Sequence, residues 1–210
     1  LDSTNFRHAE ISLKQADGML DSESPLMAEK EELWGRLSET IGDAEAAMQH
    51  FESAAKADPL RPQPLLKLAE MNATKEAWNE AANWMQRYIA TKPPSPGLRW
   101  AILGDDKLAS GQLDDAVQAF QTALRVDPYL YLGHLRLPRA YEQRNETANA
   151  VAEYEFLMKY AFDRDPDIYL KLANLYRGMG RIPDVRRVLE KGARIPPTNT
   201  DIYRLYREVQ

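Results

Sequence analysis

The clearest structural pattern in this chain runs from Trp100 to Pro128, WAILGDDKLASGQLDDAVQAFQTALRVDP. Its apolar, small and turn-forming residues are, in order, Trp100, Leu103, Gly104, Gly111, Ala116, Phe120, Ala123 and Pro128. On each side of Gly111 the apolar residues recur every three or four positions, which is the period of one face of an α-helix. Gly111 marks a turn and Pro128 marks a helix end. The stretch therefore predicts two helices joined by a tight turn.

The second half of this pattern recurs along the chain. Its glycine, alanine, aromatic and proline positions return 69 residues earlier, at the same intervals, as Gly42, Ala47, Phe51, Ala54 and Pro59. A unit between the two keeps the apolar positions as Ala81, Met85, Tyr88 and Pro93, with Glu76 in place of the turn glycine. Two further units are marked by Ala150, Tyr154 and Leu157 and by Val185 and Leu189. Five consecutive units of this kind are typical of a solenoid.

The pattern resembles the tetratricopeptide repeat, a motif of about 34 residues with a large residue at position 4, Leu at 7 and a small residue at 8. The unit at 97–130 matches it at eight positions and departs at Lys107. The other units match more loosely and span 28–61, 62–96, 131–165 and 166–199. Pro138 stands where the fourth unit should have a small residue, and we expect it to kink that helix.

The resemblance implies an all-α fold, a right-handed α-solenoid of antiparallel helix pairs. We expect about twelve helices and no sheet, because no segment shows the alternation typical of a strand. Residues 1–27 are predicted to hold part of an earlier repeat. Residues 200–210 are predicted to form a capping helix or the first helix of a truncated sixth unit.

The composition restricts the class of protein. The chain has 210 residues, 28% of them charged and 44% hydrophobic, as expected of a soluble chain. Its net charge of -5 argues against a nucleic-acid binder, whose affinity comes from neutralised phosphates. The absence of Cys excludes disulfides and thiolate zinc sites and leaves both cytoplasm and periplasm open. No apolar run reaches the length of a membrane span. The chain begins at Leu1 rather than Met, which we interpret as a piece of a longer polypeptide.

A charged face is predicted on the first helices of the units. At about 100° per residue, motif positions 4, 7, 8 and 11 share one face and positions 2, 6, 9 and 13 point the opposite way. In family members this opposite face lines the concave groove where peptides or helices bind. Its residues here, with a neighbouring arginine added last, are Glu29, Arg36, Lys67, Glu70, Asp105, Arg136, Arg139, Lys171, Asn174 and Arg177. The resemblance thus implies a non-enzymatic interaction module with a protein or peptide partner.

The basic part of this face lies in the C-terminal half. Residues 1–105 carry 11 basic and 17 acidic side chains, and residues 106–210 carry 16 and 15. Arg136 and Arg139 are close on one helix, and Lys171 takes the position of Arg136 one unit later. Arginine presents forked donors that match a carboxylate, so we predict an acidic partner segment. The alternative is a solvated helix face with no partner.

Neither a carboxylate clamp nor a chemical site is indicated. The family clamp for chain-terminal carboxylates uses Lys and Asn at positions 5 and 9. The corresponding pairs here are Glu32 and Arg36, Leu66 and Glu70, and Leu170 and Asn174. The three histidines, His8, His50 and His134, are too scattered for a metal site and are predicted at the surface or in the groove. No cofactor, metal or catalytic residue is predicted. Tyr129 and Tyr131 are candidates for an exposed aromatic contact.

Three alternatives to groove binding remain open. The chain could self-associate through apolar residues of its terminal helices, namely Phe6, Leu13, Leu20, Tyr203, Leu205 and Tyr206. It could be a repeat domain attached to an enzyme encoded before Leu1. A helical-repeat relative that binds RNA is disfavoured by the net charge and by the Trp/Leu/Gly and Ala/Phe/Ala patterns.

Overall fold

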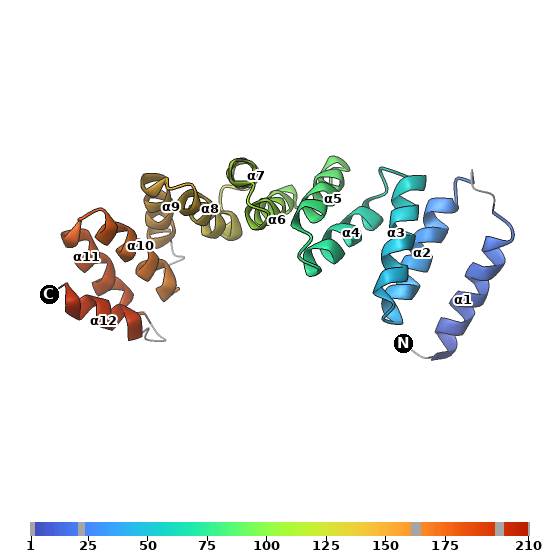
Figure 1. Cartoon of the computed structure of the whole chain (residues 1–210), viewed down its shortest axis with the longest axis horizontal. Coiled ribbons are helices and arrows are strands. Elements are labelled where there is room, and N and C mark those ends of the chain that lie inside the picture. The colour runs from blue at the N-terminus through green and yellow to red at the C-terminus, as the bar shows by residue number, and fades with distance from the viewer. Residues whose placement is uncertain (1–2, 21–23, 161–164, 196–199, 210) are drawn as a thin grey trace. The chain divides into compact units, whose positions relative to one another are not determined.

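The computed structural model describes residues 3–20, 24–160, 165–195 and 200–209, and this part of the chain contains twelve α-helices and no strand. In chain order they are α1 Ser3–Asp17, α2 Met27–Thr40, α3 Ala44–Ala57, α4 Pro62–Thr74, α5 Trp78–Ala90, α6 Pro96–Ala109, α7 Leu113–Val126, α8 Tyr131–Gln143, α9 Thr147–Lys159, α10 Pro166–Gly178, α11 Ile182–Gly192 and α12 Thr200–Glu208 (Figure 1). The predicted all-α fold is confirmed.

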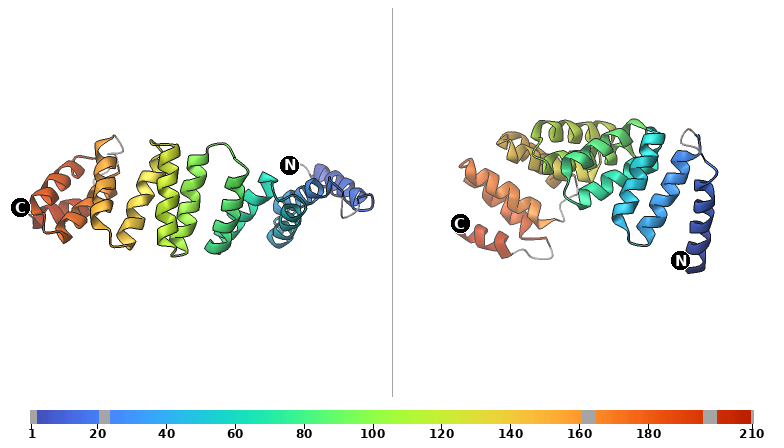
Figure 2. Two further views of the ribbon diagram at one scale, coloured as in Figure 1. Left: turned by 90° about the horizontal axis from the view of Figure 1, so that it is seen from above. Right: turned by 45° about the vertical axis from the view of Figure 1, so that its right-hand side comes forward.

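The helices pack as pairs within two compact units. The first unit, Leu1–Pro96, contains α1 to α5, and the second, Gly97–Gln210, contains the rest of α6 and α7 to α12. In the first unit α2 packs on α3 and α4 on α5, with α3 also contacting α4. In the second unit α8 packs on α9 and α10 on α11, while α7 contacts α8 and α9 contacts α10 (Figure 2). Stacked helix pairs of this kind are the elements of an α-solenoid.

The turn between the two helices of a pair has the same backbone conformation in all five pairs. The residues in the left-handed region are Gly42, Glu76, Gly111, Asn145 and Gly180, with φ between 58° and 84°. Glu76 and Asn145 adopt it although the region favours glycine. The turn is therefore fixed by the packing of the pair and does not require a glycine at each position.

One hydrogen-bond pattern closes these turns. The residue after the left-handed one donates its N–H to a carbonyl five residues earlier, the 6→1 bond of a Schellman motif. The five bonds are Asp43 to Ser38, Ala77 to Asn72, Gln112 to Lys107, Glu146 to Tyr141 and Arg181 to Tyr176, with N···O distances of 2.8–2.9 Å. Each turn thereby satisfies carbonyls that the end of the first helix would leave unpaired.

A glycine lets the two helices of a pair approach closely where an aromatic ring lies between them. An added Cβ at Gly104 would stand 2.6 Å from the ring of Phe120, and at Gly35 it would stand 2.7 Å from the ring of Phe51. Both rings are fully buried. The same device therefore shapes the α2–α3 pair in the first unit and the α6–α7 pair in the second.

Pro138 lies within α8, which continues through it as a single helix. Its ring is buried, and proline has no N–H to donate to the carbonyl of His134, four residues earlier. Helix α8 thus lacks one bond of its backbone ladder near its middle.

The terminal helices bury part of the apolar surface on which self-association would depend. Leu13 of α1 and Leu205 of α12 are buried, and Leu20 and Tyr206 are half-buried. Tyr203 is 40% exposed and donates its hydroxyl to the carbonyl of Ala193. The side chain of Phe6 lies outside the described residues. Self-association stays a prediction.

The glycine contact gives a stability prediction. We expect Gly104→Ala to overpack the α6–α7 pair and lower the free energy of unfolding by about 1–3 kcal/mol, and Gly104→Leu to cost at least as much. Gly178 is the matched control, because an added Cβ there meets no atom within 4 Å. Gly178→Ala is expected to leave stability unchanged or raise it by up to about 1 kcal/mol. Chemical denaturation measures both. Equal unfolding of Gly104→Ala and wild type would contradict the assigned packing.

Candidate interaction face

The predicted basic residues of the first unit lie close to carboxylates. Arg36 and Lys67 line a pocket of about 460 Å³ together with Glu32 and Glu39. The Nζ atom of Lys67 lies 2.7 Å from Oε1 of Glu39 and 3.8 Å from Oε2 of Glu70. Lys67 is therefore already compensated by carboxylates.

The predicted basic residues of the second unit come together. Arg136 and Arg139 of α8 and Lys171 of α10 line one pocket of about 150 Å³. The other residues that line it are Leu135, Tyr154, Asp165, Asp167 and Ile168. We call this the α8–α10 pocket. Three cationic side chains from two helix pairs thus face one small space.

Two of these three cations have no ion-pair partner in the part of the chain that the structure describes. Within the described residues, no carboxylate lies at ion-pair distance from Arg139 or Lys171. Arg136 differs, because its Nε atom lies 3.4 Å from Oδ1 of Asp105 on α6. That Nε atom is buried and makes no hydrogen bond. Burial raises the pKa of Asp105, and the charges of Arg136 and Arg139 only partly oppose this rise.

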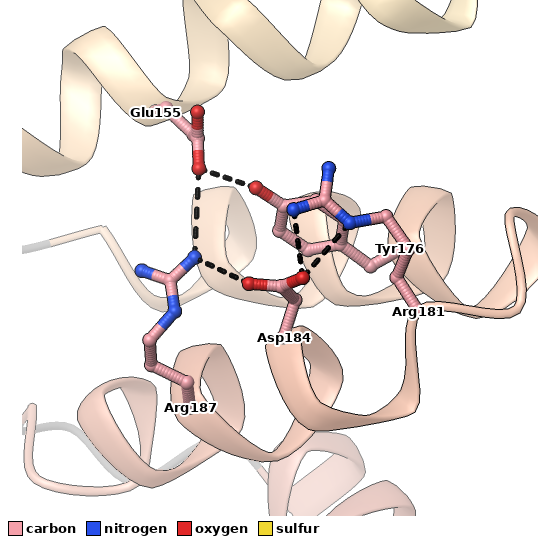
Figure 3. A network of polar contacts seen from close by, with 5 residues as sticks. All are labelled: Glu155, Tyr176, Arg181, Asp184 and Arg187. Atoms are coloured by element: carbon pink, nitrogen blue, oxygen red, sulfur yellow. Dashed lines mark hydrogen bonds and ion pairs between the residues drawn. The ribbon is translucent and has the colours of Figure 1, made fainter.

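Other basic residues of the second unit are committed to structure. Figure 3 shows Arg181 and Arg187 on either side of Asp184, in a network that reaches from α11 to Glu155 on α9. The hydroxyl of Tyr176 donates to Glu155, and burial together with this carboxylate raises the pKa of Tyr176 to about 12. Arg187 thus connects α11 to α9, and Arg181 is held within its own helix pair, so neither arginine is without a carboxylate partner.

The remaining predicted residues do not line the α8–α10 pocket. Asn174 is exposed on α10, and Arg177 is exposed and lies 3.8 Å from Glu208 of α12. Glu29 is exposed at the start of α2. The predicted face therefore contains one cluster of cations and several separate charged positions.

Several residues of the pocket were not predicted from the sequence. Asp165 and Asp167 bring two carboxylates to it, and Asp165 caps α10 by accepting the N–H of Asp167. The Asp-Pro sequence before α10 was a usable signal for such a cap. The contributions of Leu135 and Ile168 had no comparable signal, because they depend on how two helix pairs stack.

The prediction that all three histidines lie at the surface or in the groove is wrong for His134. Its side chain is buried and its ring stacks on Phe156 with centroids 4.1 Å apart. The reason is its repeat position, because His134 takes the place of Trp100 one unit later, at motif position 4. His8 is exposed. The Nδ1 atom of His50 lies 2.8 Å from Oε2 of Glu31.

The exposed tyrosines lie near the joint between α7 and α8. Tyr129 is 78% exposed and Tyr131 is 38% exposed. Burial and then the charge of Asp165 raise the pKa of Tyr131, and the charge of Arg136 partly opposes this rise. Within the described ranges, no helix is long and apolar enough to cross a membrane.

Comparison with known proteins identifies the family. A family model for the tetratricopeptide repeat matches residues 33–96 and 103–156, and the chain belongs to this family. Its repeats generally mediate protein–protein interaction. A stretch of 111 residues is 32% identical to the general transcriptional corepressor trfA of Dictyostelium discoideum. That match covers 49% of this chain and 8% of the relative, so the chain corresponds to a small part of that protein.

Two solved structures show the same fold at low sequence identity. The C-terminal part of a TPR repeat-containing protein from Cytophaga hutchinsonii aligns with a TM-score of 0.75 at 17% identity, over 96% of this chain and 81% of that one. YrrB, described as a TPR protein with an unusual peptide-binding site, aligns with a TM-score of 0.71 at 13% identity, over 93% and 97% of the two chains. At these identities the likeness shows the fold alone.

A buried carboxyl beside the face gives a pH prediction. Burial, with a smaller contribution from the charge of Asp105, raises the pKa of Asp106 from 3.8 to about 7. The folded state therefore holds a proton that the unfolded state releases, and stability falls as pH rises from about 4 to about 7. We expect Asp106→Asn to be more stable than wild type at pH 8, on the order of 1–3 kcal/mol, and to lose this advantage towards pH 4. Denaturation at several pH values measures the difference, and a constant difference would contradict the prediction.

Proposed function

We propose that this chain is a protein-interaction module whose second unit binds an acidic segment of a partner in the α8–α10 pocket. Arg136, Arg139 and Lys171 are the proposed contacts. The single observation that carries the proposal is their convergence on one pocket, in which Arg139 and Lys171 have no carboxylate partner among the described residues. A ligand carboxylate would supply that partner.

The size of the pocket limits what it can hold. Its volume is about 150 Å³, against about 460 Å³ for the pocket beside Arg36 and Lys67. This space suits one acidic side chain or a terminal carboxylate, while the rest of the segment lies outside the pocket. Asp165 and Asp167 repel a carboxylate at the start of α10, which favours contact with the arginines of α8.

The balance of charge favours a carboxylate over a more highly charged group. Three cations line the pocket together with two aspartates, and Asp105 already lies beside Arg136. A carboxylate needs only one of the two cations that have no carboxylate partner among the described residues, Arg139 and Lys171, whereas a phosphate, with a charge of about -1.5 to -2, would need both. The proposed ligand is therefore a segment rich in Asp or Glu. YrrB, which has a similar fold, is described as having a peptide-binding site, and this agrees with a peptide ligand.

Charge reversal tests this proposal. We expect the double variant Arg136→Glu, Arg139→Glu to lose binding of a fluorescent peptide of alternating aspartate and glycine. Charge-assisted hydrogen bonds contribute about 1.5–3 kcal/mol each, so affinity should fall at least about tenfold. Wild-type binding should also weaken with salt, because the screening length falls from about 10 Å at 0.1 M to about 3 Å at 1 M. Fluorescence anisotropy measures the affinity.

The chain offers a control of equal charge. Arg204 and Arg207 are exposed on α12 of the same unit, so Arg204→Glu with Arg207→Glu changes net charge equally away from the pocket. This variant should bind the peptide like wild type. An equal loss of peptide affinity in both variants would indicate non-specific electrostatic attraction. Unchanged affinity in the Arg136→Glu, Arg139→Glu variant would mean that these arginines belong to a solvated surface that binds no partner.

A further inference from the structure

His134 is held between two hydrogen-bond acceptors. Its Nδ1 atom lies 3.0 Å from Oε2 of Glu153 on α9, and its Nε2 atom lies 3.0 Å from the carbonyl oxygen of Pro128. Pro128 belongs to the joint between α7 and α8. The side chain is 8% exposed, and Phe156 of α9 covers one face of the ring. The imidazole thus connects α8 to two neighbouring segments.

The chemistry of these neighbours sets the number of protons on the ring. A backbone carbonyl can only accept a hydrogen bond, so Nε2 must carry a hydrogen to bond Pro128. An ionised carboxylate also only accepts, so Nδ1 must carry a hydrogen to bond Glu153. A neutral imidazole has a single N–H and can satisfy one of the two partners. We infer that His134 is an imidazolium that fastens α8 to α9 and to the α7–α8 joint, and that this fastening is released as pH rises.

The balance of forces on the imidazole agrees with the geometry. Burial acts to lower the pKa of His134, but the hydrogen bonds to Glu153 and Pro128 and the charge of Glu153 together raise the pKa above its ordinary value of 6.5. The groups that face the ring are Glu153 and Phe156 from α9 and the Pro128 carbonyl from the joint, and Glu153 is the titratable one among them. The contribution of protonated His134 to the free energy of unfolding is complete below pH 6.5, and it disappears as pH rises through the raised pKa of His134.

The hydrogen bonds of the His134 side chain are important for α8 because they lie where the backbone of this helix lacks a hydrogen bond. The carbonyl of His134 has no backbone donor from Pro138, so the helix lacks one of its own bonds at this level. Contacts made by the imidazole replace part of that lost restraint. Arg136 and Arg139 follow two and five residues later on the same helix, so the fastening also positions the α8 side of the pocket. This last step rests on the proposed function.

Nuclear magnetic resonance of the whole chain tests the inference without any ligand. We expect the ¹⁵N shifts of His134 to show both ring nitrogens protonated at pH 6.5, with a titration midpoint above that pH. In Glu153→Gln the midpoint should move to lower pH, because the carboxylate charge is gone. A neutral His134 at pH 6.5, with Nδ1 unprotonated, would overturn the inference, as it would place the shared proton on Glu153 or leave it absent.

Unfolding measurements give a second readout. The stability difference between wild type and His134→Gln should shrink as pH rises above 6.5, while His8→Gln controls for loss of an imidazole from an exposed site. If His134→Gln fails to fold, Glu153→Gln takes its place in the same comparison. A difference that does not change with pH would contradict the fastening.

Peptide binding separates this inference from the proposed function. Wild-type affinity for the alternating aspartate–glycine peptide should weaken across the titration of His134, and that dependence should be lost in His134→Gln. If the nitrogens titrate as expected but the peptide binds at no pH, the proposed function fails and the fastening stands. If the peptide binds equally at every pH while the nitrogens titrate, α8 positions the pocket without help from the imidazole.

Discussion

The close contact between a glycine and an aromatic ring governs how two of the helix pairs, α2–α3 and α6–α7, are built. At Gly104 the backbone of α6 lies against the ring of Phe120 on α7, and at Gly35 the backbone of α2 lies against Phe51 on α3. A side chain on either glycine would push the helices apart. Because neighbouring pairs stack on the surface that this contact creates, an error in one pair would be passed to the next.

Stacking decides which charges pair with one another and which face the proposed binding pocket. Arg181 and Arg187 both pair with Asp184, and Arg187 also reaches Glu155 of the preceding helix pair (Figure 3). Arg139 and Lys171 belong to successive pairs and face a common pocket. Repeat proteins of this kind build a binding surface from side chains that no single repeat could bring together.

Local pattern predicted most of the fold and only part of the candidate site. The period around Phe120 indicates the helix pairs, because burial of one helix face recurs at fixed spacing. The left-handed backbone conformations of Glu76 and Asn145 could not be predicted from the sequence, because the packing of the helix pair overrides the backbone preference of these residues. The predicted exposure of His134 is wrong because its burial follows from its position in the repeat and not from its residue type. Contacts between different pairs, such as Arg136 with Asp105, depend on stacking geometry that no single repeat reveals.

The left-handed residues at the turns also set how evenly stability is spread along each unit. A side chain in this region costs roughly 1–2 kcal/mol of local strain, whereas glycine adopts it freely, and asparagine tolerates it better than glutamate. The α4–α5 turn at Glu76 is thus weaker than the α2–α3 turn at Gly42 in the first unit, and the α8–α9 turn at Asn145 is weaker than its glycine neighbours in the second. Amide hydrogens beside these two turns should exchange with solvent sooner than their counterparts beside Gly42, Gly111 and Gly180, a difference between helix pairs that repeat periodicity alone would not single out.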